Sequence, residues 1–191
     1  MIKSLSHFMT AGNTGDTATE APAGIPLTSR QTLCGDIDMR IDLNGIWHYN
    51  GSPIGRKALV KLFASVLRRD SDGQHWLITP AEVCRIKVDD TAFLGVELDI
   101  CGQNRDQTIR IRTNLDDIVT VDENYPLKVT ENPETGAPHP VVNLDNGLQA
   151  RLTRPVFYEL VECGVAGTGK QAHNHGVWSC GRFFVLGNVE L

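Results

Sequence analysis

The clearest pattern of apolar and polar positions lies in the second quarter of the chain. Apolar residues recur there at spacings of three and four, the period of an α-helix with one buried side. They are Ala58, Leu59, Leu62, Phe63, Val66 and Leu67. Ser52 is a candidate N-cap and Pro53 a suitable first helical residue, although Gly55 leaves the start uncertain by a few residues. The sequence therefore predicts an amphipathic helix that ends at a turn over 70–73.

Alternating apolar and polar residues predict strands on both sides of this helix. Between 37 and 43 every second residue is apolar, which is the pattern of a half-buried strand. Asn44-Gly45 is a strong hairpin signal, and residues 46–49 would return as the partner strand. After the helix, residues 75–79 form a short strand pattern that Pro80 ends. Hairpin, helix and strand together make one compact α+β unit.

From residue 81 onward the patterns are mostly those of strands. Short alternating runs occupy 83–88, 93–100, 108–113, 118–121 and 127–129. Turn residues separate these runs and no helix intervenes, which favours an antiparallel meander that closes toward a sandwich or barrel. Residues 132–140, with three prolines and one glycine, are predicted to be a loop.

The first pattern recurs near the C-terminal end. A second predicted hairpin precedes a helix at 154–163, for which Thr153 is the candidate N-cap and Gly164 the stop. Strand patterns follow between 177 and 186. Aligning the two helices superposes their apolar stripes, so we predict a repeated hairpin–helix–strand motif. Chance similarity between two small α+β units is the alternative.

These patterns predict an α+β protein in two parts. We expect an N-terminal tail or arm over 1–32, a small α+β domain over 33–80, and a mainly β domain with one helix over 81–191. A chain of 191 residues is long enough to bury a real core. The second part is expected to be mostly antiparallel β.

Composition is that of a soluble globular protein, with 41% apolar and 21% charged residues. No run approaches the ~18 apolar residues of a membrane helix, and the N-terminus lacks the continuous apolar stretch of an export signal. The five cysteines are an odd number without a C-x-x-C pair, which indicates reduced thiols. We therefore expect a cytoplasmic protein that does not associate with membranes.

The charge is acidic overall but locally basic. A net charge of −5 argues against non-specific affinity for nucleic acid over the whole surface. The polar face of the first predicted helix nevertheless carries five of the 18 basic residues: Arg56, Lys57, Lys61, Arg68 and Arg69. Such a patch can attract an anionic partner, and an ordinary solvated face is the alternative.

The motifs of catalysis and cofactor binding are incomplete. Residues 164–171 come close to a phosphate-binding loop, but Gln171 stands where a Ser or Thr would ligate Mg²⁺, and the flanking elements are wrong. His173 and His175 lack the usual spacing of zinc ligands, and no G-x-S-x-G elbow occurs. The sequence thus predicts no catalytic residue, no metal site and no cofactor.

Four sequence segments, taken in their order along the chain, resemble those of a known family. They are DIDMRI at 36–41, GIWHYNGSPI at 45–54, RKALVKLF at 56–63 and RPVFYELV at 154–161. Over about residues 33–187 the chain resembles a bacterial family catalogued as domain of unknown function 1285. The resemblance implies a two-part α+β fold with a repeated motif, a C-terminal part loosely similar to pleckstrin-homology-like domains, and a ligand site where the parts meet. It implies no established activity, with signalling or regulation the usual suggestion, and it transfers no catalytic residues.

Binding is the chemistry that remains. Two aromatic side chains share a face of the strand over 46–49, and they either pack under the helix or form the floor of a pocket. Arginines of the second part would meet the first part at the junction. The candidate ligand-binding residues are Trp47, Tyr49, Arg56, Arg112, Arg154 and Tyr158. Buried aromatics and surface arginines held by aspartates are the alternative.

The leading hypothesis is a non-enzymatic binding or regulatory module of signalling type. It would recognise an anionic ligand, a protein or a nucleic acid at the surface between the parts. Arg56, Arg112 and Arg154 would supply charge-assisted hydrogen bonds, with stacking on an aromatic ring. An enzyme without a recognisable motif, such as a hydrolase, is the alternative, and a purely structural subunit is a third possibility.

Overall fold

The computed structural model describes residues 20–133, 135–169 and 172–188, which form two compact units. The first unit comprises the described residues up to Ala92 together with Asn146–Leu148, and the second comprises Phe93–Asp145 and the described residues from Gln149 onward. Most of the predicted N-terminal tail lies outside the described residues. Its described portion, 20–31, contains no helix or strand.

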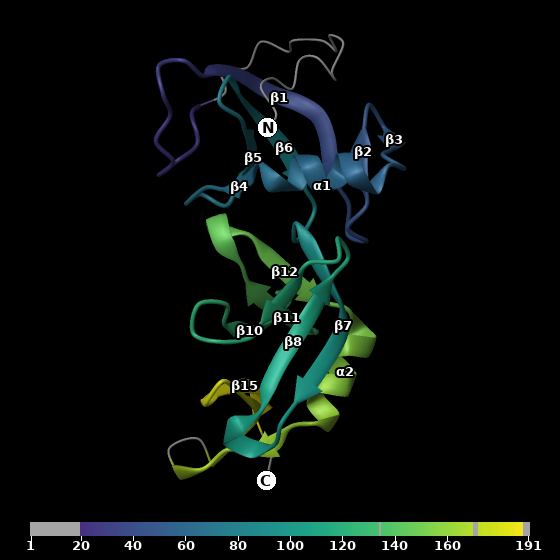
Figure 1. Cartoon of the computed structure of the whole chain (residues 1–191), viewed down its shortest axis with the longest axis vertical. Coiled ribbons are helices and arrows are strands. Elements are labelled where there is room, and N and C mark those ends of the chain that lie inside the picture. Colours follow the sequence, from purple (N-terminus) through teal and green to yellow (C-terminus); the bar gives the residue numbers. More distant parts are fainter. Residues whose placement is uncertain (1–19, 134, 170–171, 189–191) are drawn as a thin grey trace. The chain divides into compact units, whose positions relative to one another are not determined.

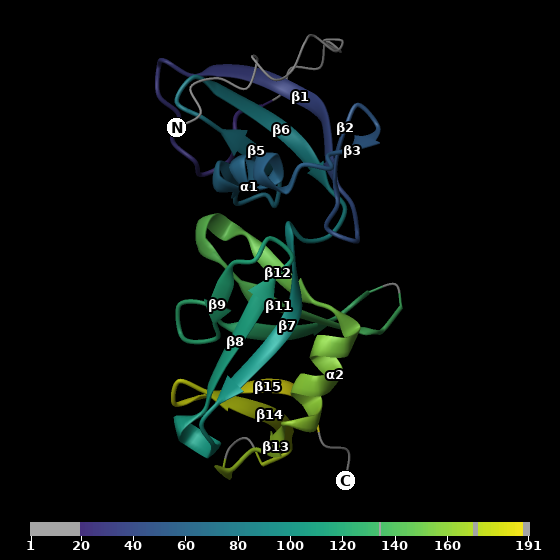
Figure 2. The same cartoon turned by 45° about the vertical axis from the view of Figure 1, so that its right-hand side comes forward.

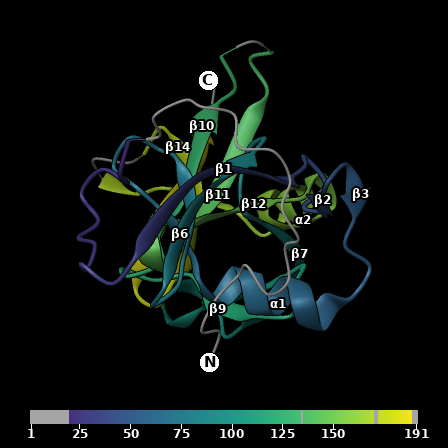
Figure 3. The ribbon, with the colours of Figure 1, turned by 90° about the horizontal axis from the view of Figure 1, so that it is seen from above.

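The first unit is a six-stranded mixed sheet with one helix (Figure 1). Its strands are β1 (Thr32–Ile41), β2 (Trp47–Tyr49), β3 (Ser52–Pro53), β4 (Leu67–Arg69), β5 (His75–Ile78) and β6 (Glu82–Val88). Their order is β3-β2-β1-β6-β5-β4, and β1 and β6 run parallel side by side (Figure 3). The predicted hairpin is confirmed, because β1 and β2 pair antiparallel across a turn in which Gly45 has a φ of 71°.

Helix α1 (Lys57–Ser65) is shorter than predicted. Arg56 is its N-cap, so the prediction of Ser52 as N-cap and Pro53 as first helical residue is wrong; these two residues form β3. After Ser65 the chain turns into β4, which pairs antiparallel with β5. Arg68 and Arg69 therefore lie on a strand and not on the helix, because pairing within the sheet outweighs the helical period of the sequence.

Strand β6 corrects the predicted boundary between the parts. A boundary after residue 80 would place residues 82–88 in the second part, but β6 pairs with both β1 and β5 inside the first sheet. The two units divide between Ala92 and Phe93. Alternation along a strand shows which face is buried, but it does not show which distant strand becomes the neighbour.

The short loop after β4 is organised by one carboxylate. Asp70, only 8% exposed, accepts hydrogen bonds from the indole Nε1–H of Trp76 at 2.7 Å and from the backbone N–H of Gln74 at 2.8 Å. It also accepts the N–H groups of Asp72 at 3.1 Å and Ala23 at 3.3 Å. This carboxylate therefore ties the segment before β1 to the β4–β5 hairpin.

The described part of the second unit contains two sheets, one α-helix and the short 3-10 helix Asn104–Asp106 (Figure 2). The larger sheet consists of β7 (Phe93–Cys101), β8 (Thr108–Thr113), β9 (Ile118–Thr120), β10 (Leu127–Glu131), β11 (Pro138–Asn143) and β12 (Gln149–Leu152). The order is β10-β11-β12-β7-β8-β9, and the β12–β7 pair is parallel. The prediction of a loop over 132–140 is wrong for the residues from Pro138 onward, because β11 begins there and pairs with β10.

Helix α2 (Arg154–Glu162) follows β12, with Thr153 at its N-cap as predicted. The smaller sheet has the order β13-β14-β15, formed by β13 (Val165–Ala166), β14 (Asn174–Ser179) and β15 (Arg182–Asn188). Both sheets and the helix contribute to one core. Among its members are Ile109 and Ile111 of β8, Leu152 of β12, Leu160 of α2, and Val177 and Phe184 of the smaller sheet.

The predicted α+β protein in two parts is confirmed. Each unit has one nine-residue helix, and the sheets are mixed or antiparallel. Within the described residues, no helix has the length and apolar character needed to span a membrane.

Candidate functional site

The candidate residues of the first unit lie in three different environments. Trp47 is 1% exposed, and its ring stacks on Phe63 of α1 with the ring centroids 6.2 Å apart. It therefore packs under the helix, the first of the two predicted alternatives. Its indole Nε1–H has no hydrogen-bond partner among the described residues. Tyr49 is half-buried, and Arg56 is exposed at the start of α1.

The candidate residues of the second unit lie on two elements. Arg112 on β8 forms ion pairs with Glu97 of β7 and with Asp116, so acidic neighbours already compensate its charge. Arg154 and Tyr158 are exposed on α2, where a spacing of four residues places them on the same side of the helix. The predicted meeting of these residues with those of the first unit stays a prediction.

The two helices begin in similar electrostatic settings. Arg56 is the N-cap of α1 and Arg154 is the first residue of α2. At both helices the N-cap side chain makes no capping hydrogen bond, and the first turn contains no acidic residue. A helix N-terminus carries partial positive charge, which an acidic side chain or a bound anion usually offsets. Here an exposed guanidinium adds further positive charge instead.

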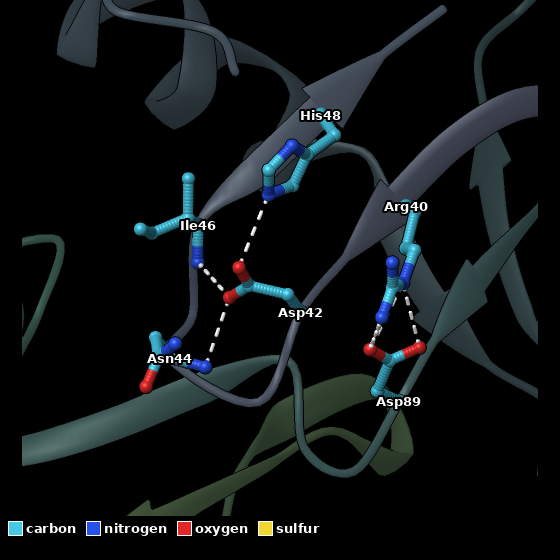
Figure 4. Close-up of polar contacts among 6 residues, drawn as sticks. All are labelled: Arg40, Asp42, Asn44, Ile46, His48 and Asp89. Atoms are coloured by element: carbon cyan, nitrogen blue, oxygen red, sulfur yellow. Dashed lines mark hydrogen bonds and ion pairs between the residues drawn. The ribbon is translucent and has the colours of Figure 1, made fainter. Parts of the chain in front are cut away.

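A polar cluster surrounds the turn between β1 and β2 (Figure 4). The Asp42 carboxylate accepts the N–H groups of Asn44 and Ile46, both at 2.9 Å, and lies 3.1 Å from Nε2 of His48. Partial burial alone would raise the pKa of Asp42, but the hydrogen bonds from Ile46, His48 and Asn44 outweigh it and lower that pKa. Arg40 forms a bidentate ion pair with Asp89 in the same view.

The Asp42–His48 pair is the arrangement that would come closest to catalytic chemistry. In nucleophilic enzymes such a histidine accepts a proton from a serine or cysteine. Within the described part of the chain, His48 makes no hydrogen bond to a hydroxyl or thiol group. The contacts of the pair that the structure shows stabilise the turn.

The incomplete phosphate-binding loop and the histidines considered as zinc ligands have structural roles where the structure describes them. Nε2 of His175 lies 3.0 Å from the carbonyl oxygen of Val161 at the end of α2. Val165 and Ala166, inside the glycine-rich segment, form β13, while residues 170 and 171 lie outside the described residues. No group of three or more His, Cys, Asp or Glu side chains able to hold a metal ion occurs in the described ranges.

A pocket of the second unit was not predicted. It has a volume of about 220 Å³ and is lined by Gln103, Asn104, Gln107, Cys163, Val165 and Trp178. These residues come from the loop after β7, from the end of α2 with β13, and from β14. No regular spacing links them in the sequence, so no motif could have indicated the pocket. We call it the carboxamide pocket after its three amide side chains.

The fold and these surfaces define a two-unit α+β protein with two helix starts and one pocket as candidate binding sites. The profile described as "Domain of unknown function (DUF1285), N-terminal domain" matches residues 30–91. The profile described as "Protein of unknown function (DUF1285), C-terminal domain" matches residues 92–186. The chain belongs to the DUF1285 family, as its sequence motifs predicted.

Two solved structures share this fold. A DUF1285 family protein from Silicibacter pomeroyi DSS-3 is 37% identical, with a TM-score of 0.77 over 90% of this chain and 92% of that chain. A DUF1285 family protein from Shewanella baltica OS155 is 24% identical, with a TM-score of 0.52 over 66% of this chain and 91% of that one. Among curated proteins no match is found.

Proposed function

We propose that this protein is a non-enzymatic binding or regulatory module that recognises an anionic group at the starts of its two helices. The observation that carries the proposal is the shared setting of Arg56 and Arg154. Each is an exposed arginine at a helix start that lacks both a side-chain cap and an acidic residue in its first turn. An anion bound there would relieve the local excess of positive charge.

The mechanism is charge-assisted hydrogen bonding. A guanidinium presents a planar fork of N–H donors that matches a carboxylate or a phosphate, and the helix dipole adds to the attraction. At α2, the exposed ring of Tyr158 lies on the same side of the helix as Arg154 and can contact the apolar part of a ligand. Arg112 has a smaller part in this proposal than the sequence suggested, because it is already paired with acids.

Titration with inorganic phosphate and pyrophosphate tests the proposal. We expect Arg56→Ala and Arg154→Ala each to weaken phosphate binding at its own helix start about tenfold, or roughly 1.4 kcal/mol, and the double variant to weaken binding at both. Arg110→Ala is the matched control, because it removes an exposed arginine that is paired with Asp99. Equal affinity in all variants would contradict the proposal. A lower Tm accompanying the loss of affinity in the helix variants would contradict it as well, because the arginines would then be structural.

The kind of anion can be separated by capture from a bacterial lysate. Wild-type protein and an Arg56→Glu/Arg154→Glu variant would be compared with and without nuclease treatment. Nuclease-sensitive capture by the wild type alone would identify a nucleic acid, and nuclease-resistant capture would identify an acidic or phosphorylated protein. Identical capture by both proteins would remove the helix starts from consideration as a docking surface.

The proposal includes a duplicated motif and a cytoplasmic location. In both units an antiparallel hairpin, β1–β2 or β11–β12, precedes a nine-residue helix that is followed by further strands. This shared order supports a hairpin–helix–strand repeat. The second unit, with two sheets and a helix around one core, supports the loose likeness to pleckstrin-homology-like domains. All five cysteines are free thiols, which fits a reducing compartment.

A further inference from the structure

We propose that the carboxamide pocket of the second unit binds a planar, uncharged heterocycle of the nucleobase type. The pocket lies near the C-terminal end of α2, since Cys163 is the C-cap of that helix. Arg154 is at the opposite end of the same helix. The proposed ligand and site therefore differ from the anion proposed at the helix starts, and the two proposals can fail independently.

Two of the six lining side chains, Gln107 and Trp178, are held by contacts that do not require a ligand. Nε2 of Gln107 donates to the carbonyl oxygen of Trp178 at 2.9 Å, and the N–H of Cys180 donates to the carbonyl oxygen of Gln107 at 2.9 Å. The Trp178 indole lies edge-on to Phe183 at 5.3 Å, and the Arg105 guanidinium lies 4.7 Å from its ring centre. These two side chains therefore lose little freedom when a ligand binds.

The pocket retains unused hydrogen-bonding capacity. Gln103 and Asn104 make backbone hydrogen bonds, and both residues are exposed, so their side-chain amides are open to a ligand. Gln107 uses its amide nitrogen and offers its side-chain oxygen. Each carboxamide presents a donor and an acceptor side by side. A ligand with adjacent donors and acceptors satisfies such groups, which is why Asn and Gln pair with the edges of nucleobases.

The remaining lining selects a flat and neutral ligand. No acidic or basic side chain is among the six lining residues, and the guanidinium of Arg105 beside them already lies over the Trp178 ring. Trp178 and Val165 supply apolar surface, and bases pack against aromatic side chains in many nucleic-acid complexes. The volume of about 220 Å³ is below the roughly 300–1,000 Å³ of sites for drug-sized molecules. A single base or nucleoside is therefore a better fit than a dinucleotide cofactor.

Cys163 allows a direct test in the full-length protein. Its exposed thiol lines the pocket, whereas the exposed thiol of Cys101 is not among the lining residues. The rate of alkylation by iodoacetamide would be followed at both cysteines by peptide mass spectrometry. The probes would be adenosine, guanosine, cytidine and uridine, with short single-stranded RNA of each base as a second arm.

We expect at least one probe to slow alkylation of Cys163, about fivefold when it is present at roughly four times its dissociation constant. Cys101 should react at an unchanged rate. Gln103→Ala should abolish the protection and leave Tm unchanged, while Asn124→Ala, which removes an exposed carboxamide from a turn of the same unit, should retain it. Protection by RNA alone would show that the base is delivered by a strand.

The proposal is overturned if no nucleoside or RNA probe slows alkylation of Cys163 relative to Cys101. It is equally overturned if Gln103→Ala leaves the protection intact. Neither outcome depends on phosphate binding at the helix starts, so the two proposals remain distinguishable.

Discussion

Trp47 of β2, in the first unit, and Trp178 of β14, in the second, have different surroundings. In the first unit, β4 and β5 follow the helix and rejoin the main sheet, and Trp47 is buried against Phe63. In the second unit, the strands after the helix form a separate sheet, and Trp178 remains half-buried at a pocket. Trp47 therefore lies in a closed core, whereas Trp178 lies at an accessible pocket.

Substitution of the two tryptophans gives the largest expected contrast. Trp47→Ala should destabilise the first unit by about 3–5 kcal/mol, because it leaves a large cavity in a packed core. Trp178→Ala should cost only about 1–2 kcal/mol, because its side chain is partly solvated. Urea unfolding of each variant measures the difference. Trp47→Phe is the matched control: it also removes the unpartnered indole N–H, so its loss should be much smaller.

Acid should act on the first unit through His75. Burial, assisted by nearby Arg69 and opposed by Asp70, lowers the pKa of this histidine from an ordinary value of 6.5 to about 4. The unfolded chain therefore takes up a proton before the folded chain does. The contribution of neutral His75 to the free energy of unfolding is fully present above about pH 6.5. It falls by roughly 2–3 kcal/mol as the pH approaches 4.

Urea unfolding of His75→Phe from pH 7 to pH 4 checks this pH dependence. The variant should lose less stability over that interval than the wild type. Residual acid sensitivity is expected at the lower end, because hydrogen bonds from Trp76, Gln74, Ala23 and Asp72 outweigh burial and lower the pKa of Asp70. The stability that these bonds contribute is lost as the pH falls through that lowered pKa. Identical pH profiles for variant and wild type would exclude His75 as the cause.

A smaller effect is expected where the second unit leaves α2. A Cβ atom at Gly164 would lie 2.1 Å from Nε2 of His175, so Gly164→Ala must displace the imidazole that contacts the Val161 carbonyl. We expect a loss of about 1–3 kcal/mol and a change in the adjoining pocket wall at Cys163. Gly187→Ala is the control, since nothing lies within 4 Å of its added Cβ. Thermal melting compares the two, and equal Tm values would contradict the steric argument.

Local sequence patterns predicted those elements that local contacts determine. The hairpin at Asn44-Gly45 and the helix after Thr153 are confirmed, because turn chemistry and apolar spacing act over a few residues. Arg68 and Arg69 were misassigned because their strand depends on pairing with β5. The arrangement of the candidate sites in space was even harder to predict from the sequence. Glu97 neutralises Arg112 across two strands, and the pocket joins side chains that are up to 75 residues apart in sequence (103 to 178).

The central position of β6 has a consequence for the order of events during protein synthesis. The strand pairs with β1 on one side and with β5 on the other, so both halves of the first sheet have an open edge until residues 82–88 have left the ribosome. Parallel pairing with β1 also closes a chain loop of some fifty residues, from 32–41 to 82–88, and such long-range closures are slow. We expect a nascent chain arrested before β6 to be degraded quickly or bound by chaperones, and one arrested well beyond it to be protected.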